Sequence, residues 1–259
     1  MNLKNKVVLI TGASSGIGKA AAFEFAKNKA KVILVARDQK KLDQTRSDLA
    51  KYDSEIMTFP CDVSNKESVF KMTDSVLDNF KKLDILVNNA GFAIYQNVSD
   101  QSVGDIEQQM STNYLGMVYC TKSFLPAMIS AHSGKIINVA SLAASFGVPK
   151  IAPYCASKFA MLGFSEALKH ELKDSGVDVT VVSPIMVKTN FFDHPSFSEM
   201  EYSRFSLESQ TVAMQIVKAA ESSKLEITVP AIARLAVWSK HTFPFLVNPL
   251  VRKSFTKKD

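Results

Sequence analysis

The chain has 259 residues, with 46% hydrophobic and 22% charged residues, a balance typical of a globular protein that buries its core without disulfides or metals. Its three cysteines form no CxxC pair and its four histidines form no HxxxH or HExxH motif, so we expect neither a disulfide framework nor a metal site. Residues 230–259 carry +5 of the formal net charge of +6, which argues against the spread basic surface of a nucleic-acid-binding protein.

Apolar runs alternate with amphipathic runs along the chain. The predicted strands are residues 6–10, 31–36, 55–61, 85–88, 135–140, 177–183 and 225–229. The predicted helices are residues 18–29, 42–52, 66–80, 105–130, 154–173 and 207–222, and Ser64 with Glu67 is predicted to cap the third. Continuous apolar strands indicate burial on both faces. The pattern therefore predicts a single α/β domain with a doubly wound, Rossmann-type sheet of seven mainly parallel strands and helices on both faces.

A glycine-rich turn, TGASSGIG at residues 11–18, follows the first strand and opens the first helix. Its glycines allow a sharp turn and let backbone N–H groups approach a pyrophosphate, which the positive end of the helix dipole also attracts. In open parallel sheets, ligands bind beyond the carboxyl ends of the strands. The position of the turn therefore predicts a dinucleotide site.

The end of the second strand is where such folds recognise the adenosine ribose of a dinucleotide. That strand ends at Ala36, which has no acceptor for a 2′-hydroxyl, and the next residue, Arg37, offers a planar cation suited to a 2′-phosphate. This arrangement favours NADP(H) over NAD(H), with Ser15 as a second contact. In the competing interpretation, Asp38 binds the ribose and Arg37 is a solvated loop residue.

Tyr154 and Lys158 begin a predicted helix at positions i and i+4, so their side chains share a face. An unperturbed tyrosine titrates at about 10, and a neighbouring ammonium together with a positive oxidised nicotinamide should lower that pKa. Ser141 directly follows the strand 135–140, where its hydroxyl could hydrogen-bond a substrate oxygen beside the phenol. These residues predict a general acid/base that exchanges a proton with a carbonyl or hydroxyl oxygen.

Five motifs in one order resemble the NAD(P)-dependent short-chain dehydrogenase/reductase family over residues 6–189. They are TGASSGIG at 11–18, Asp62-Val63, NNAG at 88–91, Ser141 with YCASK at 154–158, and the proline segment 184–189. The resemblance implies hydride transfer between a nicotinamide and a carbonyl or alcohol carbon, with Asn113, Ser141, Tyr154 and Lys158 as catalytic residues. The cofactor-binding residues expected from the motifs are Gly12, Ser14, Ser15, Gly16, Ile17, Gly18, Arg37, Asp62, Val63, Asn89, Ala90, Gly91, Tyr154, Lys158, Pro184, Val187 and Thr189.

The resemblance also implies a role for individual positions. Asp62 and Val63 would contact the adenine ring, and residues 88–91 would support the central sheet beside the cofactor. Asn113 would hold a water that relays protons toward Lys158, whose ammonium would bind the nicotinamide ribose.

The proline segment departs from the family's pattern at one position. Where the family usually has Pro-Gly, this chain has Pro184-Ile185. Isoleucine fits a positive φ poorly, so the backbone and the cofactor contacts of residues 185–187 are expected to differ. Thr189 would still hydrogen-bond the carboxamide of the nicotinamide.

Two later segments carry aromatic side chains. Residues 190–206 are predicted to cover the substrate as a lid, whose rings either favour an apolar substrate or pack the lid onto the domain. Residues 230–259 are predicted to form a basic, aromatic appendage beyond a catalytic domain of residues 1–229. Apolar residues up to Trp238 have near-helical spacing, and Pro244 and Pro249 should interrupt the segment. The appendage is expected to contact a membrane surface or to cover the substrate entrance, and the alternative is a solvated tail.

The leading functional interpretation is an NADP(H)-dependent oxidoreductase of a lipophilic ketone, aldehyde or alcohol. The alternatives are a 3-oxoacyl-thioester reductase of fatty-acid metabolism and a redox-inactive nucleotide-binding regulatory protein on the same fold. By resemblance we expect a homodimer or homotetramer with a small-molecule substrate and no nucleic-acid partner. Reduced cysteines and the lack of a membrane-spanning apolar stretch favour a cytoplasmic location, with membrane association through the appendage as an option.

Overall fold

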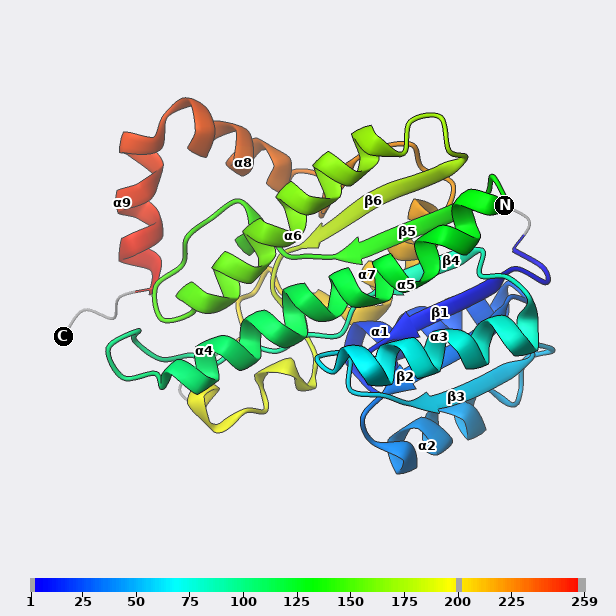
Figure 1. The fold of residues 1–259 in the computed structure, drawn as a ribbon. Helices are drawn as coiled ribbons and strands as arrows, with labels where there is room; N and C mark the ends of the chain where they lie inside the picture. The colour runs from blue at the N-terminus through cyan, green and yellow to red at the C-terminus, as the bar shows by residue number, and fades with distance from the viewer. Residues whose placement is uncertain (1–2, 199–201, 256–259) are drawn as a thin grey trace.

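The computed structural model describes residues 3–198 and 202–255, and gives only the backbone of residues 252–255. Seven strands form one parallel sheet in the order β3-β2-β1-β4-β5-β6-β9 (Figure 1). Their bounds are β1 (Val7–Thr11), β2 (Lys31–Ala36), β3 (Ile56–Pro60), β4 (Ile85–Asn88), β5 (Gly134–Val139), β6 (Val177–Pro184) and β9 (Glu226–Val229). The strand order reverses between β1 and β4, so the predicted doubly wound sheet is confirmed, and the reversal marks where a ligand cleft should open.

Helices cover both faces of this sheet (Figure 1). One face packs against α1 (Gly16–Lys27), α2 (Gln39–Leu49) and α7 (Ser209–Ala219). The other face packs against α3 (Lys66–Phe80), α5 (Gly116–Ser130) and α6 (Ala152–Glu171). All five residues of β1 are buried, as a strand covered on both sides requires. The two hydrophobic layers hold the carboxyl ends of the strands at a common edge.

The predicted helix 105–130 is one continuous helical run (Figure 1), and its winding changes at Ser111–Leu115. It consists of α4 (Val103–Met110), a π-helical turn at Ser111–Leu115 and α5. The π turn contains Asn113, which is fully buried. Isolated π turns inside longer helices frequently mark functional sites. The residue for which the sequence predicts a catalytic role therefore lies at the irregular part of the helix.

The predicted N-cap of α3 is wrong by one residue. Asn65 is the cap, because its side-chain oxygen accepts a hydrogen bond from the backbone N–H of Ser68 at 2.8 Å. The hydroxyl of Ser64 instead donates to the carboxylate of Asp62 at 2.7 Å. A carboxylate is a stronger acceptor than a neutral group, and this bond holds the loop after β3 in place.

The predicted lid begins and ends at a small second sheet. β7 (Val187–Lys188) pairs in parallel with β8 (Leu207–Glu208), so α7 begins at Ser209 rather than at the predicted residue 207. Two short 3-10 helices, Asn190–Phe192 and Pro195–Phe197, lie between the paired strands. Residues 199–201 of the lid lie outside the described residues. The pairing ties the two ends of the lid together beside the carboxyl edge of the main sheet.

The appendage contains two helices, α8 (Ala233–Thr242) and α9 (Pro244–Phe255), which project from one end of the molecule next to α6 (Figure 1). Pro244 begins α9, where the missing N–H is tolerated. Pro249 lies inside α9, so the predicted interruption there is wrong; the helix continues through the proline as α5 does through Pro126. Within the described residues, no helix combines the length and the apolar character that crossing a bilayer needs.

Candidate active site

The glycine-rich turn packs closely against its neighbours at the N-terminus of α1. Gly12 and Gly16 have φ values of +66° and +50°, which L side chains rarely adopt. A Cβ at Gly12 would lie 2.8 Å from the side-chain nitrogen of Asn89, and one at Gly16 would lie 3.1 Å from the Cβ of Thr189. Ser15, the N-cap residue, makes no side-chain hydrogen bond to the first turn. The geometry fits a pyrophosphate at this helix end.

Gly18 has a packing role. A Cβ there would collide with the carbonyl oxygen of Gly12, so the glycine allows α1 to lie close to its own turn. The turn is also bonded to the segment that follows β4. The Asn89 side chain donates a hydrogen bond to the Thr11 carbonyl at 2.9 Å. The Thr11 hydroxyl accepts one from the backbone N–H of Asn89 at 2.9 Å and another from that of Ala90 at 3.0 Å. These bonds span the point where the strand order reverses.

A cleft of about 410 Å³ extends over this edge of the sheet. The structure brings most of the predicted cofactor residues to it: Gly12, Ser14, Ser15, Gly16, Ile17, Arg37, Asp62, Val63, Asn89, Ala90, Gly91, Tyr154, Lys158 and Thr189. Three predicted residues do not line it, because Gly18 is packed beneath the turn and Pro184 and Val187 line a second cavity. The cleft has the lining and the position of a dinucleotide site.

The end of β2 presents two cations to the cleft. Arg37 lines it as predicted, and Lys41, which the sequence analysis missed, lines it one helical turn later. The Asp38 carboxylate accepts a hydrogen bond from the backbone N–H of Lys41 at 3.2 Å and so caps α2. The sequence contained a signal for Lys41. The first turn of α2 has lysines and no acid, although cations are unfavourable at a helix N-terminus. Such lysines indicate that an anion binds there.

The predicted catalytic pair lies on α6 beneath the cleft. Tyr154 is 9% exposed and Lys158 is 3% exposed, so both groups are almost fully removed from water. The Lys158 ammonium donates to the carbonyl oxygen of Val139, the last residue of β5, at 3.0 Å. Its nitrogen lies 5.5 Å from the centroid of the Tyr154 ring. The phenol also forms a hydrogen bond with Ser141, which accepts from the backbone N–H of Ala143 at 3.2 Å.

Burial controls the protonation of this pair. Removal from water raises the pKa of the Tyr154 phenol above its usual value, and the hydrogen bond with Ser141 opposes that rise. Removal from water lowers the pKa of Lys158 to about 8. The lowered phenol pKa expected beside an ammonium and an oxidised nicotinamide is not what the protein alone shows, because burial outweighs the hydrogen bond with Ser141. A neutral phenol is the form that donates a proton during reduction of a carbonyl.

Asn113 fastens the helix with the π turn to two other parts of the site. Its side-chain oxygen accepts from the backbone N–H of Phe92 at 3.0 Å, and its side-chain nitrogen donates to the Phe92 carbonyl at 2.9 Å and to the Ser157 hydroxyl at 3.1 Å. Gly91 leaves the space this requires, since a Cβ there would lie 3.0 Å from the Asn113 oxygen and 3.7 Å from the Lys158 nitrogen. These contacts give Asn113 a positioning role, and its proton-relay role stays a prediction.

A second, mainly apolar chamber of about 490 Å³ adjoins the cleft and contains Ser141. Its lining includes Pro184, Ile185 and Val187 from the proline segment. Ile185 does not adopt a positive φ, and its backbone N–H donates to the Val229 carbonyl at 2.9 Å. The departure at this position therefore leaves the backbone in an ordinary conformation and places an apolar side chain in the chamber.

The lid closes the chamber with aromatic rings. Phe191 lies edge-on to Tyr154 with ring centroids 5.5 Å apart, and Phe197 is buried against Phe191 and Phe192. The same rings line the chamber and pack the lid onto the domain, so the packing interpretation is confirmed and a preference for an apolar substrate stays a prediction. His194 lines the cleft, while its ring nitrogen accepts from the backbone N–H of Ser196.

Comparison with known proteins agrees with this geometry. The short chain dehydrogenase family model matches residues 6–197. The dehydrogenase/reductase SDR family protein 7-like of Anopheles gambiae is 32% identical over 99% of this chain and 85% of its own length. The human estradiol 17-beta-dehydrogenase 11 is 36% identical over 76% of this chain and 67% of its own length. The NADP-dependent 3-hydroxy acid dehydrogenase of Schizosaccharomyces pombe is 38% identical over 73% of this chain and 74% of its own length.

Solved structures give the same result. A short chain dehydrogenase/reductase from Burkholderia phymatum in complex with NAD is 25% identical, with a TM-score of 0.85 over 100% of this chain and 99% of its own. A metagenomic short-chain oxidoreductase in complex with NADP is 28% identical, with a TM-score of 0.77 over 88% of this chain and 98% of its own. The chain belongs to the short-chain dehydrogenase/reductase family. It is a nucleotide-binding oxidoreductase of the kind that acts on CH–OH groups.

The buried ammonium makes a testable prediction about stability. In the unfolded chain Lys158 titrates at about 10.4, whereas in the folded chain its pKa is about 8. Between these values the unfolded chain binds more protons, so rising pH stabilises the folded state by at most about 1.4 kcal/mol per pH unit. The unfolding free energy of the wild type relative to Lys158→Met should therefore rise between pH 8 and 10, measured by urea unfolding with far-UV circular dichroism. A difference that stays constant over this range would contradict the prediction.

Proposed function

We propose that this protein is an NADP(H)-dependent oxidoreductase that transfers hydride between the nicotinamide and the carbonyl or hydroxyl carbon of a lipophilic ketone, aldehyde or alcohol. The observation that carries the proposal is the place of Tyr154, which lines both the cleft and the apolar chamber. A phenol at this junction can reach the oxygen of a substrate in the chamber while that substrate faces a cofactor in the cleft. Ser141 forms a hydrogen bond with the phenol, and the Lys158 nitrogen lies 5.5 Å from the centroid of its ring.

The residues of this chain supply orientation and the proton. The cofactor, when bound, provides or accepts the hydride. During reduction, the Tyr154 hydroxyl donates its proton to the substrate oxygen, and Ser141 donates a hydrogen bond that stabilises the charge developing there. During oxidation, the same phenol oxygen accepts the proton from the alcohol. The Lys158 ammonium favours the phenolate that proton donation leaves behind, and the rings of the lid exclude water from the chamber.

The preference for NADP(H) is proposed from the cations at the end of β2. Arg37 and Lys41 line the cleft there, while the Asp38 carboxylate is occupied as the cap of α2. A 2′-phosphate would therefore meet two positive side chains and would also neutralise the lysines at the start of the helix. Among the similar proteins, the Schizosaccharomyces pombe relative is named as NADP-dependent, and the Burkholderia phymatum structure contains NAD.

The lipophilic substrate is proposed from the lining of the chamber. Side chains such as Leu142, Phe146 and Phe192 surround it, so an apolar ligand would remove apolar surface from water on both sides. A 3-oxoacyl thioester is the alternative substrate. The redox-inactive alternative is disfavoured because Asn113, Ser141, Tyr154 and Lys158 converge at one site, which binding of a nucleotide alone does not need. A screen of NADPH consumption across ketones, aldehydes and ketoacyl thioesters separates these alternatives.

We also propose the organisation of the whole protein. Residues 1–229 form the catalytic domain, with the lid at about 190–206, and residues 230–259 form the appendage. Residues 256–259 of the appendage lie outside the described residues. The proposed enzyme is a cytoplasmic homodimer or homotetramer with a peripheral membrane contact through the appendage. Its basic charge and exposed apolar side chains support that contact.

The assigned proton donor can be tested with Tyr154→Phe, which removes only the hydroxyl. Turnover of an apolar ketone with NADPH should fall by about a hundredfold or more, because no other group would donate the proton. Binding of NADPH, followed by its fluorescence, should change little. The matched control is Tyr52→Phe, which should keep wild-type turnover because Tyr52 packs on Phe23 and lines neither cavity. Substantial residual turnover in Tyr154→Phe would refute the assignment.

The cofactor preference can be tested with Arg37→Ala and Lys41→Ala. Each variant should bind NADPH about ten- to a hundredfold more weakly, because each removes a charge-assisted bond to the 2′-phosphate. Binding of NADH, which lacks that phosphate, should change far less. Lys40→Ala, which removes an exposed lysine of α2 that does not line the cleft, is the control. If the wild type binds NADH as tightly as NADPH, or more tightly, the proposed preference for NADP(H) is wrong.

A further inference from the structure

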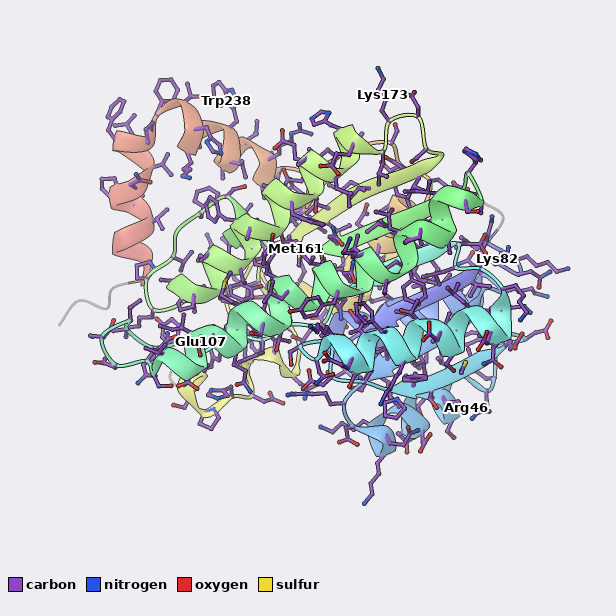
Figure 2. All side chains as sticks on the ribbon, in the orientation of Figure 1. Arg46, Lys82, Glu107, Met161, Lys173 and Trp238 are labelled. Atoms are coloured by element: carbon purple, nitrogen blue, oxygen red, sulfur yellow. The ribbon has the colours of Figure 1, made fainter. Side chains whose placement is uncertain are left out.

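The appendage presents an exposed apolar surface that nothing in the catalytic cycle uses. We call it the appendage surface, and its described side chains are Ile232, Leu235, Trp238, Phe243, Phe245 and Leu246. Each of these side chains is at least 42% exposed, and Phe245 is 71% exposed. Figure 2 shows Trp238 on α8, at the outer edge of the molecule and away from the sheet. Several exposed large apolar side chains on one short segment are typical of a binding surface for a partner or a membrane.

The same two helices also form part of the substrate chamber. Ala236 of α8 and Val251 of α9 line it, together with Phe146 and the lid residue Phe205. Lys240 fixes α8 to the domain, because its ammonium lies 6.0 Å from the centroid of the Phe146 ring and 5.5 Å from that of Phe159. α8 and α9 therefore stand between the chamber and the exposed appendage surface.

The charge of the segment identifies the partner. Residues 230–258 contain six basic residues and no aspartate or glutamate. Exposed aromatic and aliphatic side chains together with basic ones match the interface of an anionic bilayer, where the rings enter the headgroup region and the cations attract the lipid phosphates. A second copy of this chain would bring the same positive charge against itself, which is unfavourable across an interface.

We propose that α8 and α9 dock on an anionic lipid surface, and that the chamber takes its apolar substrate directly from that surface. This inference rests on the proposed oxidoreductase function, and it adds a partner and an entry route to the same site. An apolar substrate would then pass from the lipid along the wall formed by Ala236 and Val251 without crossing bulk water.

Trp238 reports the docking directly, because it is the only tryptophan in the chain and is 60% exposed. We expect its emission to shift to shorter wavelength on vesicles of equal parts phosphatidylglycerol and phosphatidylcholine, and to be quenched when the acyl chains are brominated. Vesicles of phosphatidylcholine alone should bind about tenfold more weakly or worse, and added salt should weaken binding to the anionic vesicles.

The double variant Leu235→Glu/Phe245→Glu places charge on the appendage surface and should lose vesicle binding. Phe70→Glu is the matched control, since Phe70 is an exposed aromatic residue on α3 outside the appendage. Unchanged Trp238 emission on anionic vesicles would overturn the proposal. A shift in emission that depends on protein concentration and not on lipid, with dimers in sedimentation velocity that the double variant loses, would also overturn it in favour of a second copy as the partner.

The entry route is tested separately from catalysis. With a long-chain ketone carried in anionic vesicles, the double variant should show a KM raised about tenfold or more, while Phe70→Glu keeps the wild-type value. With a short water-soluble ketone, the double variant and the wild type should have equal kcat and KM. Equal KM values for the vesicle-borne ketone would overturn the entry route. Failure of every variant and of the wild type on both ketones would instead contradict the proposed function.

Discussion

The site depends on one buried cation, the ammonium of Lys158. An ammonium removed from water is unfavourable unless protein atoms receive its hydrogen bonds, and the Val139 carbonyl at the end of β5 is the acceptor here. This bond joins α6 to the carboxyl edge of the sheet and so places Tyr154 at the junction of the cleft and the chamber. Gly91 provides the room, because a Cβ there would approach both the ammonium and the Asn113 side chain. The Lys158 ammonium therefore constrains the position of α6, the end of β5 and the loop that contains Gly91.

The parts of the fold and site that follow from local sequence patterns were predictable. The continuous apolar strands and amphipathic helices gave the doubly wound sheet. Gly12 and Gly16 predicted a sharp turn after β1, and both residues have positive φ values. The spacing of Tyr154 and Lys158 placed both on one helical face, and the structure puts them against the cleft. In each case residues close together in the sequence determine the feature, through a backbone requirement or a helical period. Such features can be predicted without knowing which distant segments come into contact.

What was missed depends on contacts between distant segments. The π turn follows from the packing of Asn113 against Phe92 and Ser157, which lie 21 and 44 residues away. The pairing of β7 with β8 joins segments on either side of the lid, so the two-residue strands carry no pattern of their own. The approach of Lys41 to the cleft depends on how α2 begins, at the cap formed by Asp38, which spacing alone does not show. The raised phenol pKa of the protein alone was not predicted, because burial cannot be inferred from spacing.

The two cavities share Tyr154, and Ala236 and Val251 of the appendage line one of them. We propose that hydride passes between the cleft and the chamber at Tyr154. The most direct measurement uses NADPH deuterated at the transferred position of the nicotinamide, with a long-chain ketone, and mass spectrometry of the alcohol. We predict one deuterium on the carbinol carbon of the product. Binding of NADPH and ketone with no labelled alcohol formed would contradict the account.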